Sequence, residues 1–177
     1  MRAAALALAL GIMLAGAARA EVTDLQPNGF EVVRKVHIAS PPDKVYAALI
    51  HPERWWNSSH SWSGDAANLR MEARPGGCWC ESLPKTKGDM LHMTVVFVDP
   101  GGTLRFEGAL GPLQQTGAMG HLTWAFAAKD GGTDLTWTYD VGGYFRGGFA
   151  PIAPAVDGVL AEQMGRFKKL VETGKPD

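Results

Sequence analysis

The sequence predicts an α+β protein in which a curved, seven-stranded antiparallel sheet wraps around one long C-terminal helix. Three observations lead to this fold. A strand followed by two short helices opens the domain, six short runs of alternating polar and apolar residues follow, and an apolar-striped helical segment ends the chain. Strands and helices do not alternate along the chain, which excludes a parallel, doubly wound sheet.

Residues 1–20 have the pattern of a signal peptide and are set apart from the folded domain. Arg2 precedes an apolar run, and Ala18-Arg19-Ala20 has the small-x-small form that signal peptidases cleave. The run is too short and too rich in alanine for a membrane span of about 20 residues; an uncleaved N-terminal anchor is the alternative. We therefore expect a signal peptide at 1–20, an N-terminal extension at 21–29, a single domain at 30–177, and a periplasmic or secreted location.

The composition limits the range of partners. Without residues 1–20 the chain would hold 157 of its 177 residues, with 15 of its 17 basic residues against 18 acidic ones. A chain of that length forms one domain with a sizeable core. The balance is mildly acidic and there is no basic run, so we expect neither nucleic acid nor, after signal cleavage, a membrane as a partner.

The first expected strand is Phe30–Ile38, whose apolar residues alternate with polar ones. Ser40 is the expected N-cap of the short helix that follows, because its hydroxyl can accept a backbone hydrogen bond. Pro41 then stands where a missing N–H is harmless. His51-Pro52 ends this helix and starts a second short one that runs through Glu53–Trp56.

Six alternating runs supply the other strands of an antiparallel meander, since turns rich in Gly and Pro separate them. The runs are Asn68–Ala73, Cys78–Leu83, Met90–Val98, Leu104–Leu110, Met119–Ala127 and Thr133–Val141. The last element is a helix from Pro154 to Thr173, closed by Gly174 and Pro176. A helix of that length spans about 30 Å, enough to cross the face of the sheet.

Several segments resemble the START-like or SRPBCC superfamily, and specifically its branch of heat-shock-protein ATPase-activator homologues and polyketide cyclase-like proteins. The segments are SPPDKVYAAL after the first strand, PERWW, RPGGCWCE, FVDPGGTLRF, GGTDLTWTY and, in the last helix, VDGVLAEQMGRFKKLV. The resemblance covers about Phe30 to Thr173 and implies the helix-grip fold. It leaves the function open, because the superfamily includes lipid carriers, cyclases, hydrolases and protein-binding modules.

The sequence argues against the activities that the name of this branch suggests. It has no Gly-x-x-x-x-Gly-Lys-Ser/Thr loop to hold a phosphate, so ATP hydrolysis is excluded and no cofactor is expected. The predicted export signal argues against a cytosolic chaperone partner.

Strand alternation places an aromatic-rich set of side chains on the face toward the C-terminal helix. The set is Leu104, Phe106, Leu110, Leu122, Trp124, Phe126, Leu135, Trp137 and Tyr139. Each of these side chains either fills the core or contacts a ligand, and as a set they favour a small-molecule pocket. The candidate ligand-binding residues are Trp55, Trp56, Trp62, Cys78, Cys80, Met93, Phe106, Trp124, Trp137, Tyr139 and Met164. The Trp55–Trp62 loop also carries His60. We expect this loop to act as a lid over the cavity, to bind a partner, or to pack against the domain and so be held in place.

Cys78 and Cys80 flank Trp79 on one expected strand, so both thiols lie on the same face. Three interpretations of the two cysteines are open: buried small hydrophobic residues, a strained redox-active disulfide, or half of a metal or thiolate site. We expect them to be buried and reduced, or at most slowly oxidised, and we assign no metal site.

The hairpin turn after this strand sets which residues face each other. If the turn is at 84–89, Leu83 lies opposite Met90. Both cysteines then face the core, while Glu81 and His92 face solvent on the convex side of the sheet. The expected pairs are Cys80 with Met93, Cys78 with Val95, and Glu81 with His92. A slip by one residue would turn the strand over and bring Glu81 or His92 inward.

The leading functional hypothesis is an exported protein that binds a small hydrophobic or aromatic molecule in a cavity between the sheet and the C-terminal helix. The first alternative is a cyclase- or hydrolase-type enzyme that uses the same cavity, with His60, Glu81, His92 or Tyr139 as acid–base groups. The second alternative is a protein-interaction module that docks through the Trp55–Trp62 loop.

Export predicts a defined mature N-terminus. Cleavage after Ala20 should leave Glu21 as the first residue, because the Ala-Arg-Ala site follows the apolar run directly. N-terminal sequencing of protein recovered from the periplasmic or culture fraction of its host checks this. Protein found in the cytosol with Met1 intact would contradict it.

Overall fold

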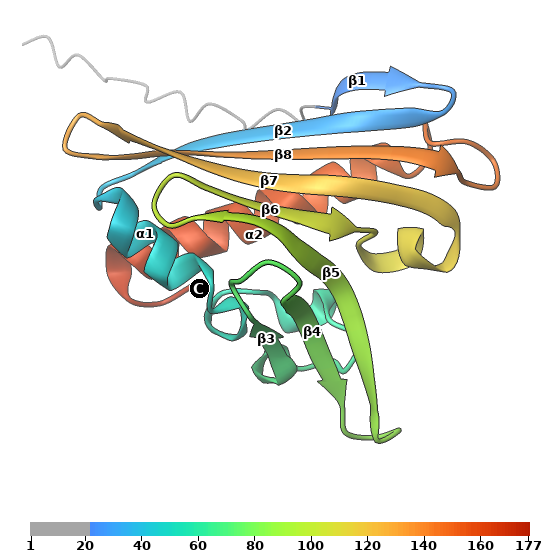
Figure 1. Ribbon diagram of the computed structural model, residues 1–177, viewed down its shortest axis with the longest axis horizontal. Helices are drawn as coiled ribbons and strands as arrows, with labels where there is room; N and C mark the ends of the chain where they lie inside the picture. The colour runs from blue at the N-terminus through green and yellow to red at the C-terminus, as the bar shows by residue number, and fades with distance from the viewer. Residues whose placement is uncertain (1–21) are drawn as a thin grey trace, which may run out of the picture.

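The computed structural model describes residues 22–177, so the signal peptide expected at 1–20 lies outside the described residues. Eight antiparallel strands form one sheet in the order β1-β2-β8-β7-β6-β5-β4-β3. The sheet curves around the long helix α2, and β4 and β5 bend away from the other strands (Figure 1). The strands are β1 (Val22–Gln26), β2 (Gly29–Ile38), β3 (Leu69–Met71), β4 (Cys78–Leu83), β5 (Gly88–Asp99), β6 (Thr103–Gly108), β7 (Gly117–Lys129) and β8 (Gly132–Tyr144).

Two α-helices and four 3₁₀ turns complete the domain, and together with the sheet they confirm the helix-grip arrangement. The helical elements are α1 (Pro42–Leu49), η1 (Pro52–Arg54), η2 (Ser58–His60), η3 (Ala66–Asn68), η4 (Gly111–Gln115) and α2 (Ala153–Thr173). Helix α2 ends as expected, at Gly174, whose φ of 82° lets its N–H bond the carbonyl of Leu170.

Two local predictions were wrong. The sheet has eight strands rather than seven, because the segment expected to be an extension forms the edge strand β1, with Leu25 opposite Phe30. This strand is mostly exposed and so lacks the apolar alternation that marks a half-buried strand. The N-cap of α1 is Pro41 rather than Ser40, and no side chain caps the helix. The backbone carbonyl of Ser40 instead accepts a hydrogen bond from the Thr133 hydroxyl at 2.7 Å.

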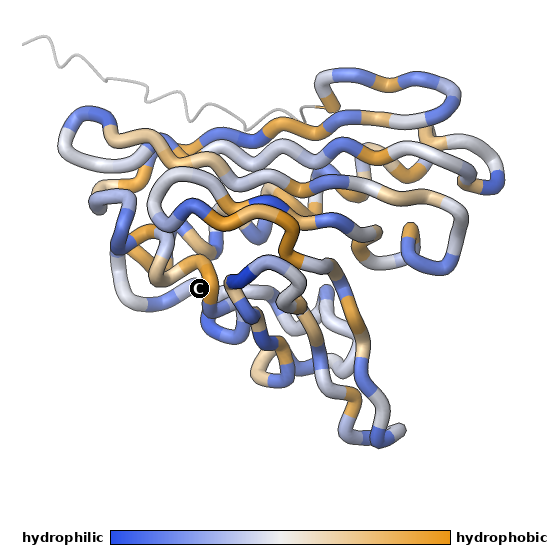
Figure 2. The backbone as a smooth tube through the Cα atoms, in the orientation of Figure 1, coloured by the Kyte–Doolittle hydropathy of each residue, from blue (hydrophilic) through white to orange (hydrophobic). Residues whose placement is uncertain are grey.

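The inward-facing residues of the central strands form the core, as alternation predicted. Along β6, β7 and β8 the buried side chains are Leu104, Phe106, Leu122, Trp124, Phe126, Leu135, Trp137 and Tyr139. Polar segments gather at the hairpin turns, including the tip between β4 and β5 (Figure 2). Leu110 lies beyond the end of β6 and is only partly buried.

An aromatic cluster fills the space between the sheet and α2. Trp55, which follows η1, is fully buried, and its ring centroid lies 5.8 Å from that of Trp137 on β8 and 5.5 Å from that of Phe167 on α2. Trp124 and Trp137 stack with their centroids 5.2 Å apart. Trp79 joins the cluster from β4, 5.6 Å from Trp124. Packed aromatic rings therefore occupy the middle of the space between the sheet and α2.

A buried ion pair fixes α2 to the sheet. The Nε of Arg34 on β2 donates to one carboxylate oxygen of Asp157 at 2.6 Å, and its Nη2 donates to the other at 2.5 Å. Asp157 is fully buried and Arg34 is nearly so. Two parallel hydrogen bonds of this kind set the orientation as well as the distance of the two elements.

Replacing Trp137 by Ala should lower the free energy of unfolding by about 3–5 kcal/mol, because removal of a ring packed on all sides leaves a cavity. The same substitution at Trp62, which is 42% exposed, should cost about 1 kcal/mol or less. Urea unfolding followed by circular dichroism measures both. Equal losses would contradict a solid core at Trp137.

Candidate functional site

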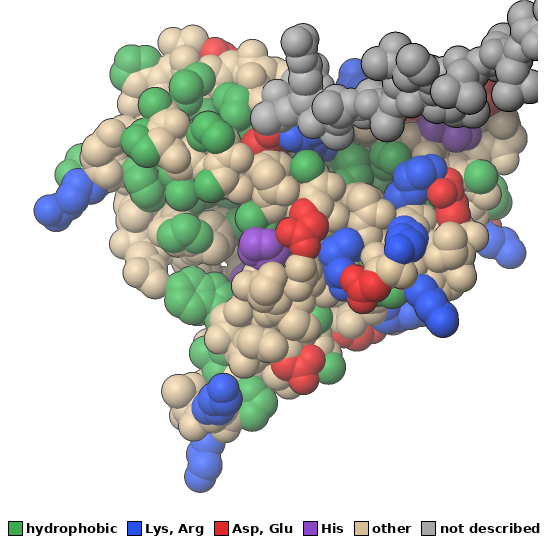
Figure 3. Space-filling model, turned by 180° about the vertical axis from the view of Figure 1, so that it is seen from behind, with side chains coloured by type: hydrophobic (Ala, Val, Ile, Leu, Met, Phe, Trp, Pro, Cys, Tyr) green, Lys and Arg blue, Asp and Glu red, His purple; other side chains and the backbone are tan. Residues whose placement is uncertain are grey.

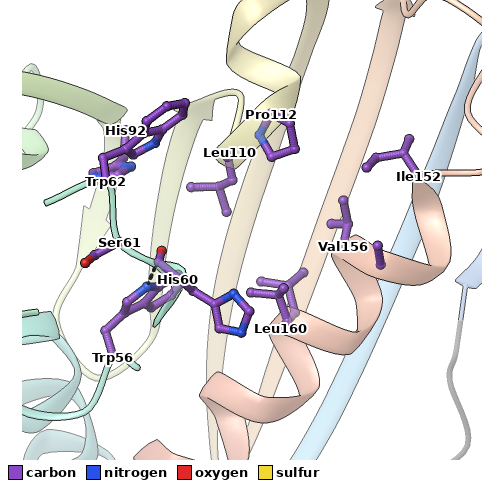
Figure 4. Close-up of a pocket in the computed structure, with 13 residues that line it drawn as sticks. Trp56, His60, Ser61, Trp62, His92, Leu110, Pro112, Ile152, Val156 and Leu160 are labelled. Atoms are coloured by element: carbon purple, nitrogen blue, oxygen red, sulfur yellow. Dashed lines mark hydrogen bonds between the residues drawn. The ribbon is translucent and has the colours of Figure 1, made fainter. Parts of the chain in front are cut away.

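A pocket of ≈ 400 Å³ lies beside the N-terminal half of α2. From α2 it is lined by Ile152, Ala155, Val156, Val159 and Leu160, and from the rest of the chain by Trp56, His60, Ser61, Trp62, His92, Leu110, Gly111 and Pro112. The helix side chains face the loop at 56–62 and the segment at 110–112 across the pocket (Figure 4). Seen from behind, the surface is hollowed beside a histidine and bordered by hydrophobic side chains (Figure 3).

The structure places the expected binding residues in two groups. Trp56 and Trp62 line the pocket, together with His60 and His92 from the catalytic candidates. The others lie in the packed core, away from it: Trp55, Met93, Phe106, Trp124, Trp137, Tyr139 and Met164. The reason is Trp55, whose ring occupies the space between sheet and helix where the cavity was expected. Of the lining residues that sequence reasoning missed, Val156 belongs to the apolar stripe of the C-terminal helix, which could have indicated it, while Pro112 is an ordinary apolar residue with no distinguishing pattern.

The expected orientation of β4 was wrong. Leu83 lies opposite Gly88, not Met90, because the turn is shorter than expected. The pairing then shifts at a bulge, where Trp79 lies opposite Met93 but the next residue, Cys80, lies opposite Leu91. A bulge of this kind leaves one residue unpaired and re-aims its side chain. Here the unpaired residue is His92, and both it and its neighbour Met93 are buried.

Because β4 is turned over, its cysteines lie on the face opposite Trp79 and Glu81, although Cys80 is buried as expected and Cys78 is half-buried. Trp79 and Glu81 are the inward residues, with 1% and 0% of their surface exposed. Cys78 and Cys80 form a disulfide, which corrects the expectation of reduced thiols. Their Cα atoms are 5.4 Å apart, well within the range that a disulfide spans. Neither cysteine lines the pocket.

Glu81 and His92 form a buried pair at the wall of the pocket, not the solvent-facing pair that was expected. The Nε2 of His92 lies 2.9 Å from one carboxylate oxygen of Glu81. The same carboxylate accepts the backbone N–H of Trp62 at 3.0 Å and that of Ser63 at 2.5 Å. Burial alone would raise the pKa of Glu81, but the hydrogen bonds from Ser63, Trp62 and His92 outweigh it and lower the pKa, so the carboxylate is ionised.

His92 is neutral near pH 7. Burial lowers the pKa of its imidazole, and the hydrogen bond and charge of Glu81 offset this only in part. A neutral ring that bonds an ionised carboxylate through Nε2 must carry its proton there, which leaves Nδ1 as an acceptor. Among residues 22–177, Nδ1 of His92 has no hydrogen-bond partner.

A second histidine, His60, ties the loop to α2. Its Nε2 lies 3.0 Å from a carboxylate oxygen of Glu162, whose other oxygen accepts the side-chain amide of Asn57. The backbone N–H of Asn57 donates to the Gln163 side chain at 2.8 Å, and the indole of Trp56 donates to the carbonyl of His60 at 3.0 Å. The first part of the loop is therefore held by packing and hydrogen bonds, while Trp62 remains at the rim.

Tyr139 does not line the pocket. Its hydroxyl accepts the N–H of Leu110 at 3.0 Å and donates to the carbonyl of Gly108 at 3.4 Å, so it holds the segment that leads into η4. Burial raises the pKa of Tyr139 to about 12, which keeps it protonated. Within the described part of the chain no cluster of three or more His, Cys, Asp or Glu side chains could bind a metal ion. No helix among residues 22–177 is both long and apolar enough to cross a bilayer.

The lowered pKa of His92 makes folding sensitive to acid. Below about pH 6.5 the unfolded histidine gains a proton that the folded one resists, so the free energy of unfolding should fall as the pH drops below that value. Stability from Glu81, whose pKa is also lowered, is lost only below about pH 4.3. His92→Gln keeps an N–H donor toward Glu81 but does not titrate. In this variant the free energy of unfolding should therefore depend less on pH in the range above about pH 4.3, where Glu81 does not contribute. Urea unfolding at several pH values measures this dependence, and His121→Gln, at an exposed site, is the control. If the free energy of unfolding changes with pH equally in both variants, the prediction is contradicted.

Comparison with known proteins places the chain in a family. Residues 29–172 match the family described as polyketide cyclase / dehydrase and lipid transport. A search of curated proteins gave no sequence match.

Solved structures share the fold at low sequence identity. The conserved protein of unknown function EF2215 from Enterococcus faecalis is 14% identical with a TM-score of 0.59, over 85% of this chain and 75% of that one. Protein MLL2253 from Mesorhizobium loti is 19% identical with a TM-score of 0.57, over 80% and 96%. DynU16, from the dynemicin biosynthetic locus, is 20% identical with a TM-score of 0.55, over 82% and 48%. With the helix-grip fold and a family match over most of its length, the chain belongs to the polyketide cyclase / dehydrase and lipid transport family of the SRPBCC superfamily.

Proposed function

We propose that this chain is an exported protein that binds a small hydrophobic or aromatic molecule in the pocket beside α2. The observation that carries the proposal is the pocket itself, whose volume of ≈ 400 Å³ falls in the range of small-molecule sites. Its walls are mainly aliphatic and aromatic, with His60, Ser61 and His92 as the polar side chains. Such a composition favours an apolar body with a few polar groups that fix its orientation.

Two further observations support the proposal. The family description includes lipid transport, a function that requires a site for apolar molecules. The signal-peptide pattern at residues 1–20 supports export.

A cyclase- or hydrolase-type enzyme is the second candidate, and the Glu81–His92 pair favours it. A histidine oriented by a buried carboxylate at a pocket wall is an arrangement suited to general base catalysis. The family description also names cyclases and dehydrases. Binding and catalysis would use the same pocket and the same residues.

Docking of a protein partner through the Trp55–Trp62 loop has less support. Trp55 is fully buried and Trp56 is 8% exposed, so both already pack inside the domain. Trp62 is the one tryptophan among residues 22–177 with a large exposed surface, and it stands at the rim of the pocket.

A fluorescent hydrophobic probe such as 1-anilinonaphthalene-8-sulfonate tests the pocket. The wild-type chain should bind it with a stoichiometry of one, and Val156→Trp should weaken binding at least about tenfold, a loss of about 1.4 kcal/mol, because the indole would fill the pocket. Gly158→Trp adds the same side chain on the same helix at an exposed position where a Cβ meets nothing within 4 Å, so it should bind as the wild type does. Absence of wild-type binding, or equal loss in both variants, would contradict the proposal.

A further inference from the structure

The disulfide between Cys78 and Cys80 is a reactive group that the pocket does not use. It joins two residues of the same strand, β4, with only Trp79 between them. Side chains alternate along a strand, so both sulfurs lie on the face of β4 opposite Trp79 and Glu81, and neither cysteine lines the pocket. The role of this disulfide is therefore separate from the binding of a ligand beside α2.

A structural role explains this bond poorly. A disulfide stabilises a fold mainly by closing a loop of the unfolded chain, and the effect becomes smaller as the loop becomes shorter. Here the cysteines are two positions apart, so the loop is among the shortest that a disulfide closes. The bond also connects no separate elements, because β4 is already paired with β3 on one side and β5 on the other. The domain therefore gains little stability from keeping the two sulfurs oxidised.

The two cysteines differ in their access to solvent. Cys78 is half-buried, whereas only 7% of the surface of Cys80 is exposed. On β5, Thr94 lies opposite Cys78, and Leu91, which is 50% exposed, lies opposite Cys80, so this face of the hairpin is open to a reagent. Exchange begins with the attack of a thiolate on an accessible sulfur. The expected point of attack is therefore Cys78, and the expected leaving group is Cys80.

A guanidinium stands on the same face as the leaving group. Arg70 on β3 lies directly opposite Cys80, and residues that face each other in an antiparallel pair have their side chains on one side of the sheet. Its Nη1 donates to Oγ of Ser82, the next residue on that face of β4, at 3.3 Å. The carboxylate of Asp89, 3.6 Å from Nη1, compensates part of the charge, and the residues opposite the cysteines on β5 are uncharged. A positive charge in this position stabilises a thiolate on Cys80.

We propose that Cys78 and Cys80 form a thiol–disulfide exchange site that oxidises a dithiol. A substrate thiolate attacks Sγ of Cys78, the bond between the two cysteines breaks, and its electron pair leaves on Cys80. The second thiol of the substrate, as its thiolate, then attacks the mixed disulfide and expels Cys78. The substrate loses two electrons and two protons and gains a disulfide, while both cysteines become thiols. A low-molecular-weight disulfide restores the oxidised chain by the reverse exchange. A reduced polypeptide and a small dithiol share the chemistry that this site requires.

The first experiment mixes the oxidised mature chain, without oxygen, with a synthetic peptide that carries two reduced cysteines. The chain should form one peptide disulfide per molecule, at least about tenfold faster than the same concentration of oxidised glutathione, because the leaving thiolate is stabilised. Chromatography of acid-quenched samples measures the rate. A rate no higher than that of oxidised glutathione would overturn the proposal, as would an equal rate in the double variant with Cys78→Ser and Cys80→Ser.

Dithiothreitol in place of the peptide distinguishes the two sources of the dithiol. A faster reaction with the peptide supports the proposal with a polypeptide as the substrate. Equal rates with both compounds, each above the glutathione reference, support it with any accessible dithiol as the substrate.

A pair of matched variants tests the part assigned to Arg70. Arg70→Gln should slow peptide oxidation by about threefold or more, because a less stabilised thiolate leaves more slowly. In the reduced chain, alkylation of Cys80 by iodoacetamide should also require a higher pH in this variant. The control is Arg74→Gln, which removes a guanidinium between β3 and β4 that pairs with Glu72 at 2.7 Å, and it should change neither measurement. Equal effects of the two variants would overturn the proposed role of the charge.

The mixed disulfide identifies the sulfur that is attacked. A peptide with one thiol should be trapped on Cys78 when the reaction is quenched with acid, and tandem mass spectrometry of the digested chain locates it. Attachment to Cys80 instead would overturn the proposed order of the two cysteines, and no attachment to either would overturn the exchange site itself.

Discussion

The buried carboxylate of Glu81 organises this end of the molecule. An ion in an apolar interior costs several kcal/mol unless charge and hydrogen bonds compensate it. Glu81 obtains its donors from two directions, the backbone of Trp62 and Ser63 in the loop and the ring of His92 on β5. The same residue therefore fixes the rim of the pocket and orients the imidazole in its wall, so the shape of the rim and the orientation of His92 have one origin.

The aromatic cluster explains where the pocket lies. Trp55 lies in the middle of the grip and contacts Trp137 and Phe167, so aromatic rings occupy the place where the cavity was expected. The open space is shifted to the N-terminal half of α2, where the small and branched side chains of Ala155, Val156 and Val159 face the loop. The packed core and the pocket thus occupy different parts of the space between sheet and helix.

Much of the fold could be predicted from the sequence, because alternation in β6, β7 and β8 and the apolar stripe of α2 are direct consequences of one-sided burial. The edge strand β1 escaped because an exposed strand has no such pattern. The candidate site was predicted only in part. Glu81, His92, His60 and two tryptophans were identified, but the face of β4 depends on a short turn and a one-residue bulge, neither of which leaves a clear mark in composition. The disulfide was one of three alternatives left open for Cys78 and Cys80, and the sequence did not single it out because its geometry depends on the local course of that strand.

The most direct test is a crystal structure of the mature chain with 1-anilinonaphthalene-8-sulfonate bound. Electron density for its rings is expected in the pocket between Trp62 and Val156, beside the N-terminal half of α2. The His92–Glu81 hydrogen bond should persist in the complex. Density for the probe between the sheet and α2 at Trp137, and none in the pocket, would contradict it.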